Sequence, residues 1–429
     1  MIITGWFVLL LALGTIPLVL SDGELLLWWL LLCVVLALFD LFLAASPRKL
    51  RLERNLPKKL RLNEQAQSEL LITNLSSRNM RLSIRDAWQP SAQSGPSRVT
   101  MSLPAKERRR ALWQLAPSRR GMVRSAFVTI RSFGPLRLTA RQVTLASPGE
   151  LKVLPPFNAR KHLPSRIARL RELEGQTVVM VRGQGTEFDS LRDYVRGDDV
   201  RSIDWRSTAR RQEVTVRTWR PERDRKVIVV IDSGRTSAAR IEDETRLDSY
   251  FESALLLSAL TSHAGDHTQV LAYDRRLRLR VAGLSGPEQL SRLMNDMAEV
   301  QPELIETDWS AIPGQIAQLS NTKSLLVLLT TIDSIGASRG LLAVLPQLTQ
   351  KHTVVIATVT DPDVALAIHE RANRDEVYRA AAAEKALQDQ DQLTAVFNRL
   401  GAEVVTATPK ELPPALADYY LALKAAGRL

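Results

Sequence analysis

The chain has 429 residues, 45% of them hydrophobic and 24% charged, a composition that excludes an intrinsically disordered protein and a length that favours two or three domains. Cys33 is its only cysteine, which excludes an intramolecular disulfide framework and a zinc site built from cysteines. The formal net charge of +12 is uneven: residues 1–47 contain no Lys or Arg, residues 46–225 contain 38 basic and 17 acidic side chains, and residues 226–429 contain 20 and 26.

Two long apolar stretches lie at the start of the chain. Residues 1–20 carry no charged side chain, and a helix of that length spans about 30 Å, the hydrocarbon thickness of a bilayer. Residues 25–45 follow a polar turn, are long enough to return, and contain Asp40 near the predicted membrane boundary. A cleaved signal peptide is the alternative for the first stretch, but it lacks a basic start and a clear cleavage site. We therefore predict a two-helix transmembrane hairpin over residues 1–45.

A basic cluster directly after the second apolar stretch predicts the orientation of this hairpin. The turn between the two stretches is acidic, and segments rich in Lys and Arg stay on the cytoplasmic side of a membrane. We therefore predict a two-pass protein of the bacterial inner membrane, with both termini and all soluble domains in the cytoplasm. The same cluster would also suit anionic lipid head groups. Its members are Arg48, Lys49, Arg51, Arg54, Lys58, Lys59 and Arg61.

Residues 46–152 predict an antiparallel β-sandwich-like domain with a basic surface. Short stretches alternate apolar and polar residues, as in MRLSIRDAW at 80–88 and FVTIRSF at 127–133, and turn-forming residues separate them. Most arginines alternate with apolar residues and are expected on the solvated face of the strands. Nucleic acid is not expected as a partner, because no recognition helix, zinc finger or stacking-aromatic pattern is present. A nearby lipid surface or an acidic partner explains the positive charge better.

Residues 153–225 are predicted to form a linker that carries a dense motif of acidic and basic side chains. Such density suits carboxylate–guanidinium pairs that clamp a non-regular segment onto the neighbouring domain, with Trp205 as its apolar anchor. Acid/base catalysis by Asp198 and Asp204 is the alternative, but the nearby arginines favour ionised carboxylates over a shared proton. We favour the structural interpretation, in which the motif is a latch that holds the segment on the neighbouring domain. A more specific form of this interpretation is that the motif also provides a partner-binding surface. The motif consists of Gly185, Glu187, Phe188, Leu191, Arg192, Tyr194, Gly197, Asp198, Arg201, Ile203, Asp204, Trp205, Ala209 and Arg210.

These residues and their spacing resemble the family catalogued as domain of unknown function 58, bacterial proteins that are often membrane-anchored. The resemblance extends to the layout of two spans, a strand-rich domain, the motif, and a domain similar to von Willebrand factor type A domains. It implies a partner, a MoxR-type AAA+ ATPase, together with a chaperone-like or envelope-assembly role. It implies no established catalytic activity.

Residues 226–429 predict an α/β doubly wound, Rossmann-type domain. Apolar strands that alternate with amphipathic helices imply a parallel sheet covered on both faces. Ligands of such sheets bind beyond the carboxyl ends of the strands. Strands are expected at 226–232, 268–274, 324–333, 352–361 and 402–408, and helices at 246–264, 287–300 and from about 413 to the end.

Oxygen-bearing side chains lie where these strands are expected to end. Asp232 and Thr236 lie in DSGRT after the first strand, Thr307 lies in IETDW, and Asp333 lies in TTIDS. The similarity to type A domains implies that such residues form a metal-ion-dependent adhesion site, in which Asp-x-Ser-x-Ser, a Thr and an Asp bind Mg²⁺. Hard oxygen ligands of this kind suit Mg²⁺ and leave one position for a carboxylate of the partner.

Two residues weigh against a metal at this position. Gly234 replaces its first Ser and removes one hydroxyl, and Arg235 would compete with a divalent ion for the same carboxylates. As an alternative, Asp232 and Asp333 are helix caps or turn formers. A degenerate Mg²⁺ site therefore stays open, and a partner-binding face without metal is the favoured interpretation.

Histidine ligands are not expected to form a metal site. Of the five histidines, His263 and His267 form the only pair with helical spacing. They read HAGDH instead of the HExxH of zinc peptidases, and Gly265 indicates the end of a helix.

Together these patterns predict a non-enzymatic interaction protein anchored in the inner membrane, whose type A-like domain binds a cytoplasmic protein partner. The chain contains no GxSxG, HExxH or GxxxxGK[ST] motif. Two alternative functions stay open. One is an envelope-associated hydrolase with an unrecognised site, and the other is a scaffold whose basic domain binds lipid or an acidic polymer.

Overall fold

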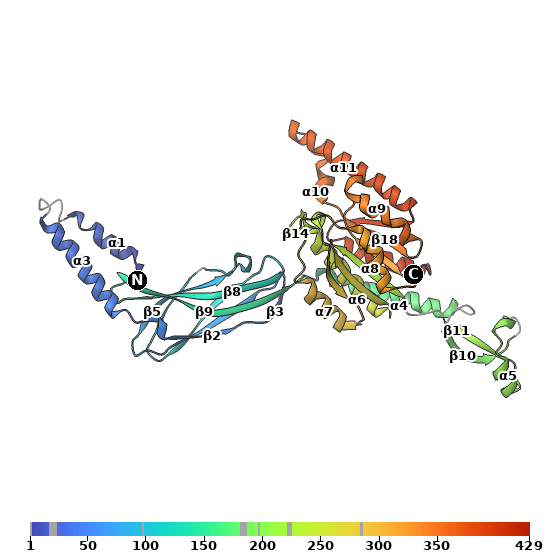
Figure 1. Ribbon diagram of the computed structural model, residues 1–429, viewed down its shortest axis with the longest axis horizontal. Helices are drawn as coiled ribbons and strands as arrows, with labels where there is room; N and C mark the ends of the chain where they lie inside the picture. Colours follow the sequence, from blue (N-terminus) through green and yellow to red (C-terminus); the bar gives the residue numbers. More distant parts are fainter. Residues whose placement is uncertain are drawn as a thin grey trace. The chain divides into compact units, whose positions relative to one another are not determined.

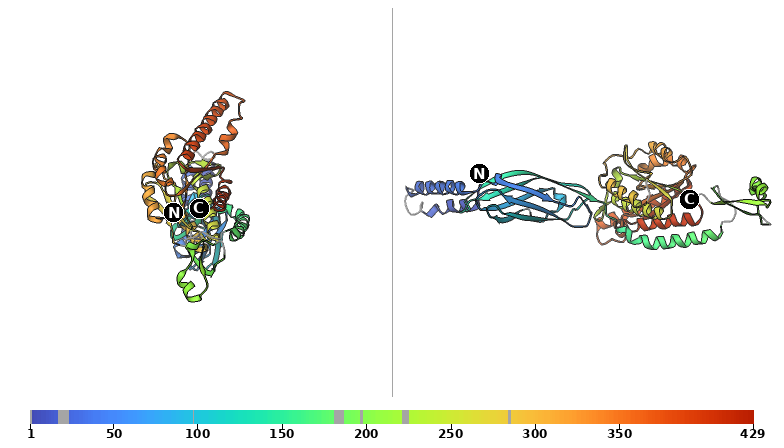
Figure 2. Two further views of the ribbon diagram at one scale, coloured as in Figure 1. Left: turned by 90° about the vertical axis from the view of Figure 1, so that its right-hand side faces the viewer. Right: turned by 90° about the horizontal axis from the view of Figure 1, so that it is seen from below.

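The computed structural model of the chain describes residues 2–16, 24–96, 98–180, 187–195, 198–220, 225–283 and 286–429. The chain divides into two compact units, Met1–Pro156 and Phe157–Leu429. Figures 1 and 2 show that the first unit consists of helices and β-sheets, whereas the second contains a sheet covered by helices.

The first unit contains two β-sheets. The larger sheet has the order β1-β9-β8-β5-β6, with β3 also paired to β9, and the smaller sheet has the order β2-β4-β7. The β3–β9 pair is parallel, and the other pairs of described strands in this unit are antiparallel. The largely antiparallel, strand-rich fold predicted for this region is therefore confirmed. The strands are β1 (Ile2–Ile3), β2 (Leu50–Asn55), β3 (Lys59–Arg61), β4 (Ala66–Asn74), β5 (Met80–Trp88), β6 (Val99–Leu103), β7 (Arg108–Leu115), β8 (Gly121–Phe133) and β9 (Thr139–Leu154).

Alternation of apolar and polar residues along the strands produces the core between these sheets. In β4, Leu70 and Ile72 are fully buried, and their neighbours in sequence are less buried. They pack in one cluster with Leu82 of β5, Ile130 of β8 and Trp113 of β7. The period of two in the sequence therefore separates the buried face from the solvated face, as expected for antiparallel sheets.

One arginine of the basic cluster is buried in this unit instead of lying on a solvated face. Arg54 forms two parallel hydrogen bonds to Asp86, with Nη1–Oδ2 and Nη2–Oδ1 distances of 2.7 and 2.9 Å. Its guanidinium lies 5.3 Å from the ring centre of Trp88. A Cβ atom at Gly149 would lie 2.8 Å from Cδ of Arg54, so this side chain fills the space that the glycine leaves. Bidentate pairing makes such burial of two charges possible.

Two apolar helices precede the strands of the first unit: α1 (Gly5–Ala12) and α3 (Glu24–Leu43). Within the described residues, one helical span, Leu25–Lys49, is long and apolar enough to cross a membrane, with a mean hydropathy of 2.6. Cys33 and Ala37 of α3 pack against Phe7 of α1, but most large apolar side chains of α3 are exposed. An anchor in a membrane is compatible with this helix. The polar turn predicted between the two spans is Ser21-Asp22-Gly23-Glu24; its first three residues lie outside the described residues, and Glu24 is the first residue of α3.

The end of α3 is bonded to the turn between β8 and β9. The carboxylate of Asp40 accepts hydrogen bonds from the backbone N–H of Leu136 at 2.7 Å and of Thr139 at 2.8 Å. A Cβ atom at Gly134 would overlap this carboxylate, so the turn requires a glycine there. Asp40 lies near the predicted membrane boundary in the sequence, and its role in the fold is to hold α3 on the β-sheet.

The residues before α1 are bonded to the same turn. Ile2 and Ile3 pair with Ala140 and Thr139 of β9, and the backbone N–H of Thr4 donates to the carbonyl of Leu138 at 3.1 Å. Thr4, before α1, and Asp40, near the end of α3, are therefore held by the same turn.

The second unit contains a six-stranded sheet with the order β16-β15-β12-β17-β18-β19. All neighbouring pairs are parallel except β15–β16. The predicted doubly wound α/β fold is therefore confirmed, and the five expected strands are present. The antiparallel edge strand β16 was not expected, because LRLRV is short and arginines interrupt its apolar pattern. The strands are β12 (Lys226–Asp232), β15 (His267–Tyr273), β16 (Leu277–Val281), β17 (Leu325–Leu329), β18 (Thr353–Val359) and β19 (Ala402–Ala407), and a separate short pair is formed by β13 (Arg240–Ile241) and β14 (Glu244–Thr245).

Helices cover both faces of this sheet. Val227, Val229 and Ile231 of β12 pack with α4, α6, α7 and α12, whereas Ile228 and Val230 pack with α8, α9 and α11. Both faces of the central strand are thus buried, which is why KVIVVID is apolar throughout. The helices are α4 (Leu163–Met180), α6 (Arg246–His263), α7 (Gly286–Met297), α8 (Ile312–Leu319), α9 (Ile335–Thr349), α10 (Pro362–Ala367), α11 (Arg374–Arg399) and α12 (Leu412–Ala425).

Part of the segment predicted to be a linker belongs to the second unit. Leu163, Ile167 and Leu170 of α4 pack into the core that α6 and α12 share. The motif that follows has regular structure: β10 (Glu187–Asp193) pairs antiparallel with β11 (Thr215–Arg220), and α5 (Trp205–Arg211) lies between them in sequence. The expectation of a non-regular segment was therefore wrong. Charged residues on both faces of these strands conceal the period of two.

Candidate functional site

The candidate site lies at the carboxyl edge of the α/β sheet, which we define as the loops 233–239, 274–276, 303–308, 330–334 and 360–361. The chain passes from β12 to β15 on one side and later to β17 on the other, so the loops diverge beside β12. In doubly wound sheets ligands bind where strand order reverses in this way. Backbone hydrogen bonds join two of the loops: Arg235 N–H donates to the carbonyl of Ile305 at 2.8 Å, and Glu303 N–H donates to that of Ser233 at 2.9 Å.

Asp232 is buried at the centre of the carboxyl edge and accepts four hydrogen bonds. Thr330 Oγ1 donates at 2.7 Å, Thr236 Oγ1 at 3.4 Å and the backbone N–H of Gly234 at 2.8 Å. The hydroxyl of Thr307 is the fourth donor. Burial raises the pKa of the Asp232 carboxyl, and these hydrogen bonds oppose that effect only in part. The site prediction named Asp232, Thr236 and Thr307, and the structure brings these three together.

Thr330 is a site residue that the sequence analysis missed. It directly follows β17, the neighbour of β12, and its buried hydroxyl bonds Oδ2 of Asp232. Its position could have indicated this role, because it lies at the end of an apolar strand and three residues before Asp333.

Gly234 is required by the close approach of two loops. A Cβ atom at this position would overlap Oγ1 of Thr307 and lie 2.9 Å from the carbonyl oxygen of Ile305. A serine at this point of the adhesion-site pattern would therefore displace the loop that carries Thr307. The residue that departs from the pattern allows the Thr307 hydroxyl to reach Asp232 directly.

Asp333 does not join Asp232. Its carboxylate pairs with Arg246 of α6 at an Nη1–Oδ2 distance of 2.8 Å, and the same Nη1 lies 3.4 Å from the hydroxyl of Thr331. Tyr250 bonds that hydroxyl at 3.1 Å, and burial raises the pKa of Tyr250. The structure therefore separates the fourth predicted metal ligand from the other three, because its carboxylate is paired with Arg246 of α6.

As arranged, these residues do not fit Mg²⁺. The Asp232 carboxylate accepts from four donors, the Asp333 carboxylate is paired with Arg246, and Arg235 lies 3.0 Å from Glu306 at the surface of the same edge. Within the described residues, no group of three or more His, Cys, Asp or Glu side chains could hold a metal ion. His263 and His267 also do not form a pair of ligands, since His263 Nδ1 is 2.7 Å from the carbonyl of Ala259 in its own helix.

A second buried carboxylate at the carboxyl edge belongs to Asp274, which directly follows β15. It accepts from Nε of Arg278 at 2.7 Å, from Oγ of Ser233 at 3.2 Å and from the backbone N–H of Arg276 at 2.9 Å. Burial acts to raise the pKa of Asp274, but hydrogen bonds from Arg278 and the backbone leave it below its usual value. This residue was not predicted from the sequence, although an Asp at the end of a strand, followed by several arginines, could have indicated it.

The surface of the carboxyl edge exposes apolar side chains. Leu304, in the same loop as Thr307, is 80% exposed. The helices α10 and α11 follow β18 and form an arm that projects from the rest of the unit (Figures 1 and 2). A groove of about 620 Å³ lies between them and is lined by Leu366, Glu370 and Arg379, among others. Tyr378, at the start of α11, is 64% exposed.

The motif at 187–220 forms its own network of ion pairs. Arg192 pairs with Asp198 at 2.6 Å, and Arg217 pairs with Asp204 at 2.7 Å. Asp204 also accepts from the backbone N–H of Ser207 at the start of α5, and this hydrogen bond together with Arg217 lowers the pKa of Asp204. Each carboxylate thus has its own arginine, which argues against a proton shared between the two.

The remaining motif residues are partly described. Trp205 is 69% exposed, so its predicted role as apolar anchor of the segment was wrong. Leu191, Tyr194 and Ile203 are half-buried, and Arg201, Ala209 and Arg210 are exposed. Gly185 and Gly197 lie outside the described residues, and so do the side chains of Glu187 and Phe188. That the motif clamps onto the α/β domain stays a prediction.

Comparison with known proteins gives one family and several similar folds. Residues 190–367 match the family described as "Protein of unknown function DUF58". The VWA domain of SpRpn10 is 13% identical, with a match over 47% of this chain and 94% of that one and a TM-score of 0.28. The CARDB domain of the PF1109 protein from Pyrococcus furiosus is 18% identical, with a match over 24% of this chain and 87% of that one and a TM-score of 0.18. The FixG-related protein from Vibrio parahaemolyticus is 8% identical, with a match over 24% of this chain and 96% of that one and a TM-score of 0.16. No curated protein matches the chain.

Proposed function

Since this chain belongs to the DUF58 family through residues 190–367, we propose that it is a membrane-anchored, non-enzymatic interaction protein. Its α/β domain, similar to type A domains, binds a protein partner at the carboxyl edge. The family resemblance supports a MoxR-type AAA+ ATPase as that partner, in a chaperone-like or envelope-assembly role.

The exposed apolar surface of the carboxyl edge carries this proposal. Leu304 is largely exposed at this edge, and β18 leads from the same edge into α10. A groove of about 620 Å³ lies between α10 and α11, and Tyr378 of α11 is also largely exposed. Exposed apolar side chains beside charged ones are typical of protein-binding surfaces. The Arg235–Glu306 pair, half or more exposed, would lie at the polar rim of such a surface.

The buried carboxylates at this edge support binding over catalysis. Asp232 and Asp274 are almost inaccessible, and their oxygens already accept hydrogen bonds from the loops that surround them. A general acid or base must come within hydrogen-bonding distance of its substrate. These two side chains instead hold the loops that present Leu304 in place.

The contacts at both ends of the apolar segment support a hairpin that crosses the membrane twice. α3 has 20 residues and would span about 30 Å. Thr4 and Asp40 are bonded to one turn of the first unit. If α3 crosses the bilayer, the chain between Thr4 and α3 crosses it as well. The basic cluster from Arg48 onward then favours the cytoplasm for both units.

Site-specific photo-cross-linking in cells tests the proposed surface. A photoreactive amino acid replaces Leu304 or Tyr378, and Val396 serves as the matched control. Val396 is an exposed apolar residue of the same helix as Tyr378, but it lies at the other end of α11. We expect one and the same protein to be cross-linked from 304 and 378 and not from 396. Equal labelling from all three positions, or none from any, would contradict the proposal.

A charged substitution in this surface tests where the partner binds, independently of which protein the partner is. Leu304→Asp is expected to abolish the cross-link from position 378, because a buried aspartate at the centre of an interface is strongly unfavourable. Mass spectrometry of the cross-linked band identifies the partner. A protein other than an AAA+ ATPase would overturn the partner assignment and leave the face intact.

A further inference from the structure

We propose that the first unit binds the head group of an anionic phospholipid in a pocket of about 460 Å³ beside the start of α1. The pocket is lined by Thr4, Trp6, Arg81, Ser83, Thr100 and Arg137, among others. A cavity of this size suits a small ligand. The lipid assignment rests on the membrane anchoring proposed above, whereas the affinity of the pocket for phosphate does not.

The strands β5, β6 and β8 form the floor of this pocket. Arg81 and Ser83 of β5 lie opposite Ser102 and Thr100 of β6, so all four side chains share one face of the sheet. Phe133 of β8 lies opposite Arg81 on the other side. One guanidinium and three hydroxyls, groups that can all donate hydrogen bonds to a ligand, therefore surround the same space.

A second guanidinium comes from the turn between β8 and β9. Arg137 adopts a left-handed backbone conformation, with a φ of +60°. Its carbonyl accepts a hydrogen bond from Oγ1 of Thr4 at 2.5 Å, which fixes this turn against the start of α1. The wall of the pocket is therefore made by the same contacts that hold the apolar segment on the sheet.

The two arginines lack anionic partners. Among the described residues, neither Arg81 nor Arg137 has a carboxylate oxygen within 4.0 Å. Two cations that line one pocket repel each other, and an anion between them removes that repulsion. Guanidinium groups bind phosphate oxygens through paired hydrogen bonds, which makes a phosphate ester the ligand of choice.

The surroundings of the pocket favour a lipid over a soluble phosphate. Trp6 is 61% exposed, and Leu136 is exposed in the same turn as Arg137. Asp40, near the end of α3, bonds the backbone of Leu136, so the turn that contributes Arg137 to the pocket is also the turn that holds α3. Tryptophan is enriched at the level of lipid head groups. Trp6, Met101 and Phe133 give the pocket apolar walls that suit the glycerol and the first acyl carbons.

Native mass spectrometry of the full-length chain in detergent tests the proposal. Short-chain phosphatidylglycerol is titrated against the wild type and against the double variant Arg81→Gln, Arg137→Gln. We expect binding to the wild type and at least a roughly tenfold weaker affinity of the double variant, since two charge-assisted hydrogen-bonding groups are lost. The matched control is Arg85→Gln, Arg119→Gln, which removes the same charge from exposed positions outside the pocket lining. It is expected to bind as the wild type does.

Further ligands distinguish the source of the phosphate. Phosphatidylcholine of the same chain length is expected to bind more weakly, because its choline is positively charged. Glycerol phosphate that binds as tightly as phosphatidylglycerol would assign the pocket to a soluble phosphate ester and overturn the lipid assignment. Equal losses in the two double variants, or no phosphatidylglycerol binding at all, would overturn the site.

The membrane anchor is tested separately. Alkaline carbonate extraction of cell membranes that released the chain would contradict the anchoring in the proposed function. A chain that stays in the membrane but fails to retain phosphatidylglycerol would contradict the pocket alone.

Discussion

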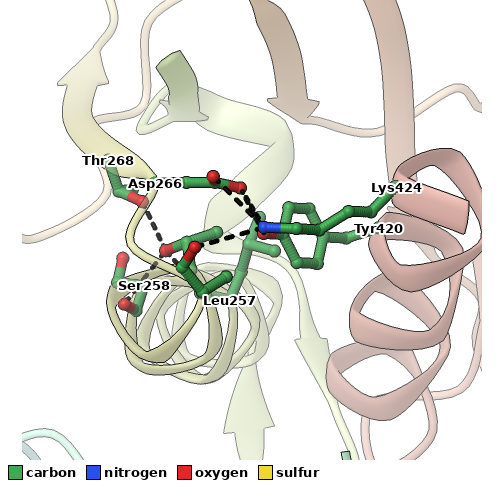
Figure 3. A network of polar contacts seen from close by, with 8 residues as sticks. Leu257, Ser258, Asp266, Thr268, Tyr420 and Lys424 are labelled. Atoms are coloured by element: carbon green, nitrogen blue, oxygen red, sulfur yellow. Dashed lines mark hydrogen bonds and ion pairs between the residues drawn. The ribbon is translucent and has the colours of Figure 1, made fainter. Parts of the chain in front are cut away.

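Two buried aspartates at opposite edges of the α/β sheet are held by different kinds of partner. Asp266 precedes β15 and contacts Lys424 at 3.2 Å and the hydroxyl of Tyr420, both from α12 (Figure 3). Asp232 is the last residue of β12 and contacts only uncharged donors. A cation thus ties the last helix to the sheet at the first edge, whereas hydroxyls and an amide hold the surface loops around Asp232 at the second edge. The difference indicates that Asp266 fixes a helix on the sheet, whereas Asp232 positions surface loops.

The largest expected effect follows from removal of the cation at the first edge. Lys424→Met leaves the carboxylate of Asp266 buried without a charged partner and is expected to lower the free energy of unfolding by about 3 kcal/mol. Urea denaturation of the full-length chain in detergent measures the change. The control is Lys410→Met, whose pair with Glu242 is exposed to solvent, so its loss is expected to leave the free energy of unfolding nearly unchanged. Equal effects of the two substitutions would show that Asp266 is not held by charge.

A serine at Gly234 restores the adhesion-site pattern and tests how closely the loops approach at the second edge. Gly234→Ser is expected to destabilise the fold by about 2 kcal/mol, because its Cβ would overlap Thr307 and meet the carbonyl of Ile305. Gly314→Ser is the control, since nothing lies within 4 Å of a Cβ there. Thermal melting with and without Mg²⁺ is the measurement. Unchanged stability together with a melting shift in Mg²⁺ would contradict the arrangement of the Thr307 loop.

Removal of one uncharged donor has a smaller expected effect. Thr330→Val keeps the shape of the side chain but removes a hydrogen bond to Asp232, and about 1.5 kcal/mol of stability should be lost. Thr349→Val is the control, because that hydroxyl bonds only carbonyls of its own helix. If both substitutions lower the urea midpoint to the same extent, the hydroxyl of Thr330 does not support Asp232.

The sequence predicted the strands well and the partners of the site poorly. KVIVVID and TQVLAYD are apolar runs whose burial on both faces requires a covered parallel sheet, so their positions follow from composition alone. The donors around Asp232 come from positions 236, 307 and 330, and their meeting depends on the strand order. The pairing of Asp333 with Arg246 joins residues 87 positions apart and has no local signal. Strands 187–193 and 215–220 were missed because charged residues occupy both of their faces.

The pH dependence of stability provides the finest test, because two buried aspartates of the carboxyl edge should act with opposite signs. Burial raises the pKa of Asp232, so its protonated form favours the folded state, and its contribution is present at low pH and lost as pH rises through the raised pKa. Hydrogen bonds from Arg278 and the backbone lower the pKa of Asp274, so its contribution is present above the pKa of the unfolded chain and lost as pH falls through the lowered pKa.

Relative to Asp232→Asn, the wild type should lose stability as pH rises above about 4, whereas relative to Asp274→Asn it should lose stability as pH falls below that value. Urea midpoints measured across this range decide the point. Two differences of the same sign would mean that a cation also neutralises Asp232, and the contrast between hydroxyl partners and charged partners would then fail.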